Sequence, residues 1–377
     1  MLRKKLYEIA DIRAGGTPSR NNPDYWNGNI PWVKISNING KYVTTYDETI
    51  TELGLKNSSA KLFEKETILY TIFATLGRVG ILQFDATTNQ AIAGIKIKDN
   101  SISTDYLYYY LRSLESYVKD IGNGAAQQNI NQTILKNFIV PVISKEKQSQ
   151  ICSELENIEN VLLKKQHNLA SLDELIKSRF IEMFGDIVLN DKSWASETIT
   201  KVCPIKQYDG KITECDGKIW LLNLDLVESN TGTVLDKYYV TKKEIGSSTI
   251  TFSENNVLYS KLRPYLNKVI IPDGNGYATS EFIPFYPLSQ VNKYYLAYAL
   301  RSDSFVTLIN SKASGAKMPR APMDFIRSFP LPLPPIELQN EFAELVKLID
   351  KSKFIVQKEI KDLQELLDKK MDEYFGQ

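Results

Sequence analysis

The sequence predicts an α+β protein in which two similar α/β globules are separated by a long antiparallel coiled-coil helix pair. Three observations predict this class: a long helical stretch occurs twice, its apolar residues keep a coiled-coil spacing, and a strand-rich segment precedes each copy. The two stretches, residues 138–186 and 329–377, align without a gap, so that Gln148 meets Gln339 and Phe184 meets Phe375. A repeat this long indicates a tandem duplication rather than a solenoid.

The apolar residues of both helical stretches recur at alternating spacings of four and three residues, with interruptions at Lys165 and Lys353. This spacing is typical of a coiled-coil seam, and not of the broader stripe of a helix that lies on a globule. Two seams in one chain can pair with each other, each over about 60 Å at 1.5 Å per residue. The alternative is that each amphipathic helix packs on its own globule. The predicted seam consists of Ile151, Leu155, Ile158, Leu162, Leu169, Leu172, Ile176, Met183, Phe342, Val346, Ile349, Val356, Ile360, Leu363, Leu367 and Tyr374.

These patterns divide the chain into four segments. The first globule is expected over residues 1–142 and the second over 187–333. The central helix is expected over residues 143–186 and the C-terminal helix over 334–377.

The first globule reads as short strands separated by turns. Gly15 and Gly16 predict a turn, and Asn27-Gly28 predicts a tight turn before a strand at 30–35. Runs of β-branched and aromatic residues predict strands at 67–73, 79–84 and 92–97. Aromatic and aliphatic residues at helical spacing predict a helix at 106–119, and a polar loop then leads to a last strand.

The second globule follows the same plan with little identity. The segment IWLLNLDLV corresponds to IPWVKISNI, VLYSKLRPYLNKVI to ILYTIFATLGRVGI, and YYLAYALRSDSFV to YLYYYLRSLESYV. The strand and helix positions correspond, whereas the polar loops differ. A duplicated frame with different loops suggests two binding modules with different specificities.

Composition excludes several classes of protein. The chain has 377 residues, 43% hydrophobic and 24% charged, with a net charge of +1. It has no charged and then apolar leader at its start, and no apolar run approaches the ~18 residues of a membrane span. We therefore expect a cytoplasmic protein without membrane contact.

The sequence contains no recognisable metal-binding or catalytic motif. The three cysteines form no CxxC pair, and the single histidine, His167, lies among charged residues in a predicted helix. Asn22-Pro23-Asp24-Tyr25 has aspartate where an amino-methyltransferase loop has its second proline, and no GxxxxGK[ST] phosphate loop occurs. Pro272-Asp273 with Glu281 lacks the lysine of a nuclease motif. We therefore predict a protein without catalytic residues, bound metal or cofactor.

The chain strongly resembles the specificity subunit of type I restriction-modification systems over essentially its whole length. The resemblance is carried by GGTPSRNNPDYWNGNIPW, LGRVG, NQAI and GNGAAQQNINQ, and by the helical runs that end in MFGD and YFGQ. The second globule departs from this pattern, because SKASGAKMPRAP replaces GNGAAQQNINQ and no GGTP segment precedes Trp220.

This resemblance implies a division of labour between subunits. Each globule would be a target recognition domain that reads one half of a bipartite sequence in double-stranded DNA. The helices would set the spacing and dock two methyltransferase subunits, and restriction or translocase subunits would be further partners. S-adenosylmethionine, ATP and Mg would then be bound by these partner chains.

DNA-reading side chains need paired donors and acceptors on loops: Gln or Asn for adenine, Arg or Lys for guanine. In the first globule the candidates lie in three Gly- and amide-rich loops: Thr17, Ser19, Arg20, Asn21, Arg78, Asn89, Gln90, Gln127, Gln128 and Asn129. In the second globule the candidates are Lys206, Tyr208, Lys211, Lys261, Arg263, Tyr265, Lys312, Lys317 and Arg320. Some of them would contact phosphate, which sets register without reading sequence.

Two alternatives remain open from the sequence. The same glycines and amides are also what solvated turns contain, so any single candidate can be a plain loop residue. The whole chain can also be read as a duplicated coiled-coil scaffold, without catalytic activity, whose globules bind protein or glycan.

Overall fold

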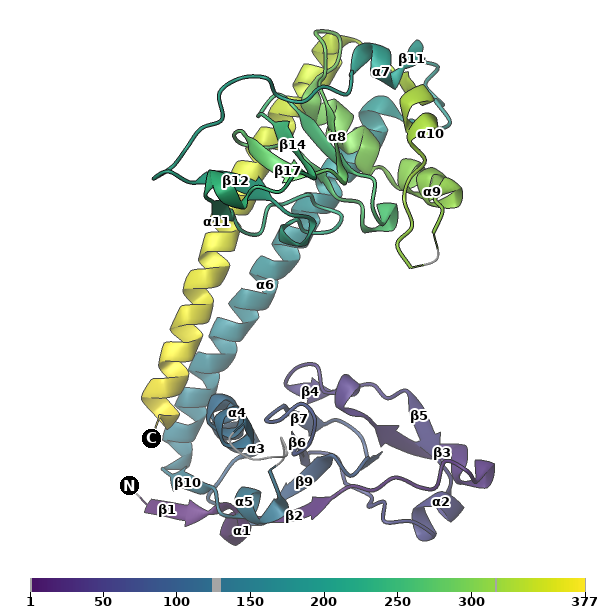
Figure 1. Ribbon diagram of the computed structural model, residues 1–377. Helices are drawn as coiled ribbons and strands as arrows, with labels where there is room; N and C mark the ends of the chain where they lie inside the picture. Colours follow the sequence, from purple (N-terminus) through teal and green to yellow (C-terminus); the bar gives the residue numbers. More distant parts are fainter. Residues whose placement is uncertain (1, 124–129, 316, 377) are drawn as a thin grey trace. The chain divides into compact units, whose positions relative to one another are not determined.

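The computed structural model describes residues 2–123, 130–315 and 317–376 (Figure 1). It confirms the predicted α+β class, with two strand-rich globules and two long helices, α6 (Lys145–Phe184) and α11 (Ile336–Phe375). The chain forms two compact units: unit 1 comprises Met1–Lys164 and Ile360–Gln377, and unit 2 comprises Lys165–Glu359. Each unit therefore contains one globule and a part of both long helices.

Three sheets organise the globule of unit 1. Its strands are β1 (Leu2–Lys5), β2 (Ala10–Ala14), β3 (Trp26–Val33), β4 (Tyr42–Val43), β5 (Glu48–Ile50), β6 (Ile68–Thr71), β7 (Val79–Leu82), β8 (Thr87–Thr88), β9 (Ile92–Ile97) and β10 (Ile139–Val142). The largest sheet has the order β2-β9-β6-β7-β4, and the others are β5-β3-β8 and β1-β10. Strands β6 and β7 are buried along their whole length, as their continuous apolar runs predict.

The helices of unit 1 are α1 (Leu6–Ile9), α2 (Glu52–Lys56), α3 (Thr104–Ser113), α4 (Glu115–Asn123) and α5 (Gln132–Lys136), with short 3-10 turns η1 (Pro23–Tyr25) and η2 (Ile35–Asn37). Ser103 caps α3 by accepting a hydrogen bond from the Tyr106 N–H. The helix predicted at 106–119 is therefore two helices, which meet at Leu114. The tyrosines of α3 are buried in the main core of the unit.

The Asn27-Gly28 prediction needs correction. These residues do not form a turn between strands but lie inside β3, where Trp26 and Ile30 both face Ile50 across a bulge. Asn27 has a φ of 62°, and a Cβ on Gly28 would meet the Ile50 carbonyl oxygen at 2.5 Å. An Asn-Gly pair supplies left-handed backbone to a bulge as well as to a hairpin turn, so the pair alone cannot distinguish them.

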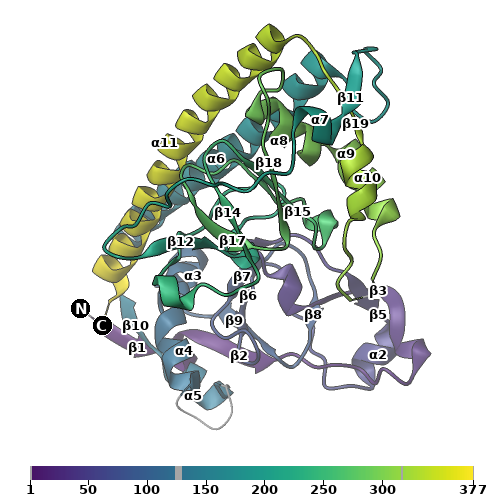
Figure 2. The same cartoon turned by 45° about the horizontal axis from the view of Figure 1, so that its top comes forward.

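Unit 2 repeats this plan, and Figure 2 shows its strands β12, β17 and β14 side by side. The strands are β11 (Ser196–Thr198), β12 (Ile219–Leu222), β13 (Tyr239–Val240), β14 (Thr249–Phe252), β15 (Val257–Ser260), β16 (Val269–Ile270), β17 (Gly276–Thr279), β18 (Phe282–Phe285) and β19 (Pro330–Pro332). They form sheets with the orders β13-β12-β17-β14, β16-β15-β18 and β11-β19. The helical elements are α7 (Ile199–Val202), α8 (Lys293–Arg301), α9 (Asp303–Lys312), α10 (Met323–Ser328), η3 (Leu224–Leu226), η4 (Lys242–Glu244) and η5 (Pro264–Leu266).

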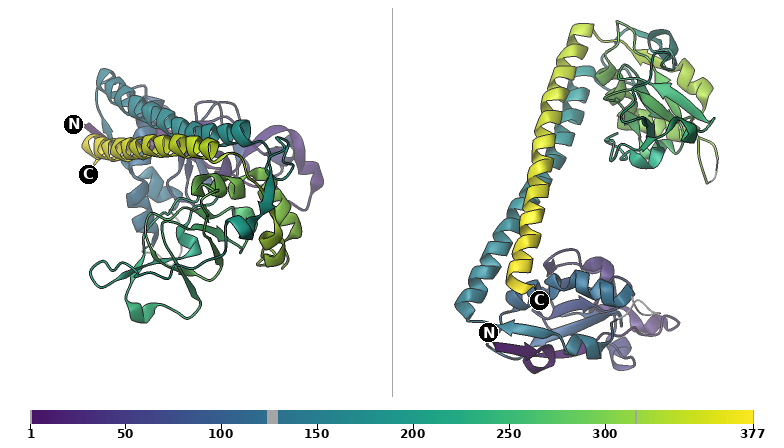
Figure 3. Two further views of the ribbon diagram at one scale, coloured as in Figure 1. Left: turned by 90° about the horizontal axis from the view of Figure 1, so that it is seen from above. Right: turned by 60° about the vertical axis from the view of Figure 1, so that its left-hand side comes forward.

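Within unit 1, the last turns of α11 run beside the first turns of α6 (Figure 3). The predicted seam residues Ile151, Leu155, Leu162 and Leu367 are buried there, and Ile158, Ile360, Leu363 and Tyr374 are partly buried. Lys370 pairs with Glu154 at 3.1 Å. A residue early in α6 thus meets one late in α11, which makes the pair antiparallel.

Within unit 2, the later part of α6 packs on the earlier part of α11. Ile176, Phe342, Val346 and Ile349 are buried, and Leu172 and Met183 pack against them. Leu169 and Val356 are half-buried. The seam prediction omitted Phe180, Phe184, Met371 and Phe375, which are also buried.

These aromatic residues anchor each helix end to a globule. Phe184 packs edge-on against Tyr295 and Phe342, with ring centroids 4.9 and 5.4 Å away. Phe375 contacts Tyr106 in unit 1, with ring centroids 5.4 Å apart. The helices therefore pack on each other, as the seam predicts, and each C-terminal end also packs on the globule that does not precede that helix in the chain. These end contacts are not those of the alternative, in which each helix packs on its own globule.

The two lysines that interrupt the seam are paired across the helices. Lys165 contacts Glu359 at 2.7 Å, and Lys353 contacts Asp173 at 2.5 Å. The Lys353 side chain is only 14% exposed. The interruptions are thus polar layers in which each lysine has an acid on the other helix.

A buried glutamine joins each globule to the start of its helix. The Gln148 amide donates to the Ser101 and Ile143 carbonyl oxygens at 2.7 and 2.9 Å, and its oxygen accepts from the Ser103 N–H. Gln339 makes the same three bonds in unit 2, with Gln290, Pro334 and Asn292. The duplication therefore preserves a complete buried hydrogen-bond network.

Candidate functional site

The opening loop of unit 1 is fixed by its two glycines. The Gly15 N–H donates to the Ile92 carbonyl at 2.9 Å, and the Gly16 N–H donates to the Thr88 carbonyl at 2.8 Å. A Cβ on Gly15 would meet the Thr88 Oγ1 atom at 2.0 Å, so only glycine permits this approach. The loop is thereby held against the segment after β8, where the Thr17 hydroxyl donates to the Gln90 side chain.

Arg20 is held in place by an acid and an indole ring. Its guanidinium lies 3.6 Å from the Trp26 ring centroid and pairs with Glu48 at 2.7 Å. Glu48 also pairs with Lys34, and these contacts, that of Lys34 foremost, lower the pKa of the Glu48 carboxyl. The neighbouring candidates Ser19 and Asn21 are exposed. The charge of Arg20 is therefore partly compensated inside the protein.

The middle candidates of unit 1 lie on either side of the end of β6. The backbone of Arg78 exchanges hydrogen bonds with Thr71, while its side chain is exposed. The Asn89 side chain accepts from the Ala91 N–H at 3.1 Å, and the Ala91 carbonyl accepts from Ile72. The structure thus brings the opening loop and the loops after β6 and β8 together. Gln127, Gln128 and Asn129 lie outside the described residues.

In unit 2, one segment runs beside β18 and β14 and carries the candidates Lys206, Tyr208 and Lys211. The Lys206 N–H donates to the Pro284 carbonyl at 2.9 Å, and the Tyr208 N–H donates to the Thr251 carbonyl at 3.3 Å. The Lys206 ammonium lies 3.5 Å from Asp209, and Lys211 is exposed.

The other candidates of unit 2 converge on one loop cluster. Leu262 forms a β-bridge with Arg320, and the Arg263 N–H donates to the Pro319 carbonyl at 2.7 Å. Tyr265 is 51% exposed, and Lys312 and Lys317 are exposed nearby in the chain segment that reaches Arg320. Two segments far apart in the sequence therefore form one basic surface, which we call the unit 2 loop cluster (residues 261–267, 312–315 and 317–321).

Arg320 is fixed by Glu281. Its Nε and Nη2 atoms donate to the two carboxylate oxygens, with the shortest contact at 2.8 Å. This fork-shaped contact lowers the pKa of the Glu281 carboxyl and raises that of Arg320.

Sequence reasoning missed the acids that hold these arginines. Glu48 and Glu281 lie far in sequence from Arg20 and Arg320, and no spacing pattern links them. Trp26 could have been found, because its segment YWNGNIPW stands out as aromatic within a polar loop.

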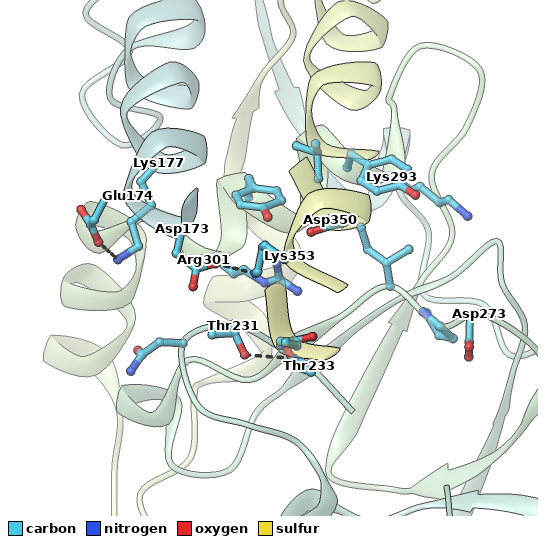
Figure 4. A pocket seen from close by; sticks show the side chains of 18 of the residues that line it. Asp173, Glu174, Lys177, Thr231, Thr233, Asp273, Lys293, Arg301, Asp350 and Lys353 are labelled. Atoms are coloured by element: carbon cyan, nitrogen blue, oxygen red, sulfur yellow. Dashed lines mark hydrogen bonds and ion pairs between the residues drawn. The ribbon is translucent and has the colours of Figure 1, made fainter. Parts of the chain in front are cut away.

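A cavity of about 660 Å³ lies elsewhere in unit 2, between α6, α8, α11 and the loop that contains Thr231 (Figure 4). It contains the Lys353–Asp173 pair and a Lys177–Glu174 pair at 2.8 Å. Arg301 lines it and donates to the Val269 carbonyl, and burial lowers its pKa. None of the predicted DNA-binding residues that the structure describes lines this cavity.

The described residues contain no cluster of three or more potential metal ligands. Among the same residues, no helix combines the length and apolarity that a membrane span requires. Asn22-Pro23-Asp24-Tyr25 forms a 3-10 turn capped by the Asn22 side chain, as expected for a plain turn.

Comparison with known proteins identifies relatives over most of the chain. A family model described as "Type I restriction modification DNA specificity domain" matches residues 3–174 and 227–365. The MjaIX specificity subunit of a type I restriction enzyme from Methanocaldococcus jannaschii is 27% identical, over 97% of this chain and 90% of that protein. The EcoR124I/EcoR124II specificity subunit of Escherichia coli is 26% identical over 50% of this chain and 48% of that protein.

Solved structures share the fold. The type I restriction-modification S subunit from M. genitalium has a TM-score of 0.53 at 16% identity, covering 98% of this chain and 94% of that one. A chain from a study of the assembly and conformational transition of the type I R-M system has a TM-score of 0.61 at 14% identity, covering 99% and 97%.

Proposed function

This chain belongs to the family of type I restriction modification DNA specificity domains, and on that premise we propose that it is the DNA-recognition subunit of a type I restriction-modification complex. The observation that carries the proposal is the family match to both units, together with loops that differ between two equivalent frames. Residues 1–142 and 187–333 are the recognition domains, and each reads one half of a bipartite target.

The loops of each unit support this assignment. Exposed arginine, lysine and amide side chains gather on strand ends whose backbone is fixed by hydrogen bonds, as base recognition requires. The net charge of the chain is only +1. Because phosphate contacts supply most of the non-specific affinity, the isolated chain binds DNA weakly and partner subunits strengthen binding.

The chemistry belongs to partner chains in this proposal. Two methyltransferase subunits dock on the helices, bind S-adenosylmethionine and methylate adenine, and restriction or translocase subunits supply ATP- and Mg-dependent cleavage. The chain itself acts without a cofactor and in the cytoplasm. The rival reading, a scaffold that binds protein or glycan, finds no support in the family match or in the relatives.

The test is to sequence methylated adenines in cells that carry this chain and its partner methyltransferase. We expect one motif with two fixed halves and an unread spacer, absent from cells that carry the methyltransferase alone. Methylation without a bipartite motif would contradict the proposal.

A further inference from the structure

The hairpin loop between β15 and β16 places a large side chain where the backbone favours glycine. Arg263 has a φ of 49°, in the left-handed region that side chains rarely adopt. The equivalent residue in unit 1 is Ala74, with a φ of 62°. Arg263 is the third residue after Ser260, the last residue of β15, which pairs with the first residue of β18. Ala74 is likewise the third residue after Thr71, the last residue of β6, which pairs with the first residue of β9. The two positions are therefore equivalent. The fold that the two units share therefore imposes the left-handed conformation at this position. Unit 2 has an arginine there, whereas unit 1 has an alanine.

Three hydrogen bonds to two other segments, residues 319–321 and Glu281, fix the backbone at this position. The Arg263 N–H is bound to the Pro319 carbonyl at 2.7 Å, and the Lys261 carbonyl accepts from Ala321 at 2.8 Å. The Lys261 N–H donates to the Glu281 carbonyl at 3.0 Å. Because the backbone cannot turn, the direction in which the Arg263 side chain leaves it is also fixed.

The guanidinium of Arg263 lacks hydrogen-bond partners among the described residues. The Nε atom of Arg263 is buried and has no hydrogen-bond partner among the described residues. An outside acceptor cannot reach this buried atom, but the side chain is only half-buried, and its Nη atoms are not buried and make no hydrogen bond to the described residues. These Nη atoms are therefore open to an acceptor from outside the protein. Arg320, by contrast, already donates from Nε and Nη2 to Glu281. The two arginines of the unit 2 loop cluster therefore differ: Arg320 is held by Glu281, and the Arg263 side chain has no acceptor among the described residues.

We propose that Arg263 reads a guanine in the second half of the target, and that Arg320 and Glu281 are positioning residues for its loop. This inference rests on the proposed function. Guanine presents O6 and N7 as a pair of acceptors to an arginine fork, and such readout requires a fixed donor direction. A phosphate contact needs no such fixation, and the exposed Lys312 and Lys317 suit that role.

The decisive variant is Arg263→Gly in the full chain with its partner methyltransferase. Glycine adopts the left-handed conformation without strain, so the variant removes the guanidinium and keeps the fold. We expect one guanine of the second half-site to become degenerate, with about a 10–100-fold loss of preference, while the first half-site and the spacer are unchanged. We also expect the Tm of Arg263→Gly to equal or exceed that of the wild-type chain. If the Arg263 side chain had only a structural role, its removal would lower the Tm.

Three further variants serve as controls. Ala74→Gly relieves the same backbone strain in unit 1 and should leave the whole motif unchanged. Lys317→Ala should weaken binding to all sequences alike and reduce the salt dependence by about one phosphate contact. Arg263→Lys keeps the charge but loses the fork, and it should relax the same guanine position as Arg263→Gly.

Several results would overturn the inference while the proposed function stands. These are a wild-type second half-site without guanine, an unchanged motif in Arg263→Gly, equal weakening of all sequences, or a lower Tm together with a lost motif. A guanine preference retained by Arg263→Lys would overturn it as well. If the wild-type chain gave no bipartite motif, the proposed function itself would fail first.

Discussion

The buried glutamines Gln148 and Gln339 show what single side chains contribute to this fold. Each is fully buried and makes three hydrogen bonds that link a globule to a long helix. Their equivalence is visible in the sequence repeat, but their burial is not, because glutamine is usually exposed.

We expect Gln148→Leu to lower the free energy of unfolding by about 2–5 kcal/mol, because it leaves three partly buried backbone groups, those of Ser101, Ser103 and Ile143, without partners. Urea unfolding followed by circular dichroism measures this change. The matched control is Gln364→Leu on the exposed side of α11, which should change stability by no more than about 0.5 kcal/mol. Equal midpoints for the two variants would refute the role assigned to Gln148.

The three cysteines should differ in reactivity. Cys152 and Cys203 are buried, and burial raises the pKa of each thiol to about 12, whereas Cys215 is exposed. Because the thiolate is the reactive form, the two buried thiols stay protonated and inert at pH 8. Ellman's reagent should therefore titrate one thiol in the native protein and all three in denaturant. Fast reaction of a second native thiol would show that this burial is wrong.

At the scale of elements, the polar layers of the helix pair account for its pairing register. Lys353 lies in the seam and pairs with Asp173 on the other helix. A shift in the register of the two helices would separate Lys353 from Asp173 and leave both charges without compensation. Removing one partner leaves only the other charge without compensation.

We predict that Lys353→Asp destabilises the protein and that adding Asp173→Lys restores part of the loss. A coupling free energy of about 1 kcal/mol is expected, since Asp173 remains partly exposed and solvent screens the pair. The double-mutant cycle is measured by urea unfolding. Additive effects of the two substitutions would mean that the pair does not set the register.

The same scale shows how far sequence reasoning reaches. The spacing of apolar residues predicted both long helices, because burial along one face produces a regular pattern in the sequence. Runs of β-branched and aromatic residues predicted the strands β6, β7 and β9. The aromatic residues at the helix ends were missed, since they contact globules whose surfaces no periodicity encodes. Glu48 and Glu281 were missed for a related reason: an ion pair between distant segments leaves no local pattern.

At the scale of the whole molecule, both long helices are shared between the two units. The boundary falls after Lys164 in α6 and after Glu359 in α11, beside the Lys165–Glu359 pair. In our account, the helices determine the number of unread base pairs between the two half-sites.

The most direct test inserts seven residues of coiled-coil sequence into each helix, between Lys164 and Lys165 and between Glu359 and Ile360. Seven residues are two helical turns of a coiled coil, so the seam continues in register while each helix lengthens by about 10 Å. Sequencing of methylated adenines should then return the same two half-sites with a spacer longer by about three base pairs. The same half-sites at the original spacing would contradict the account.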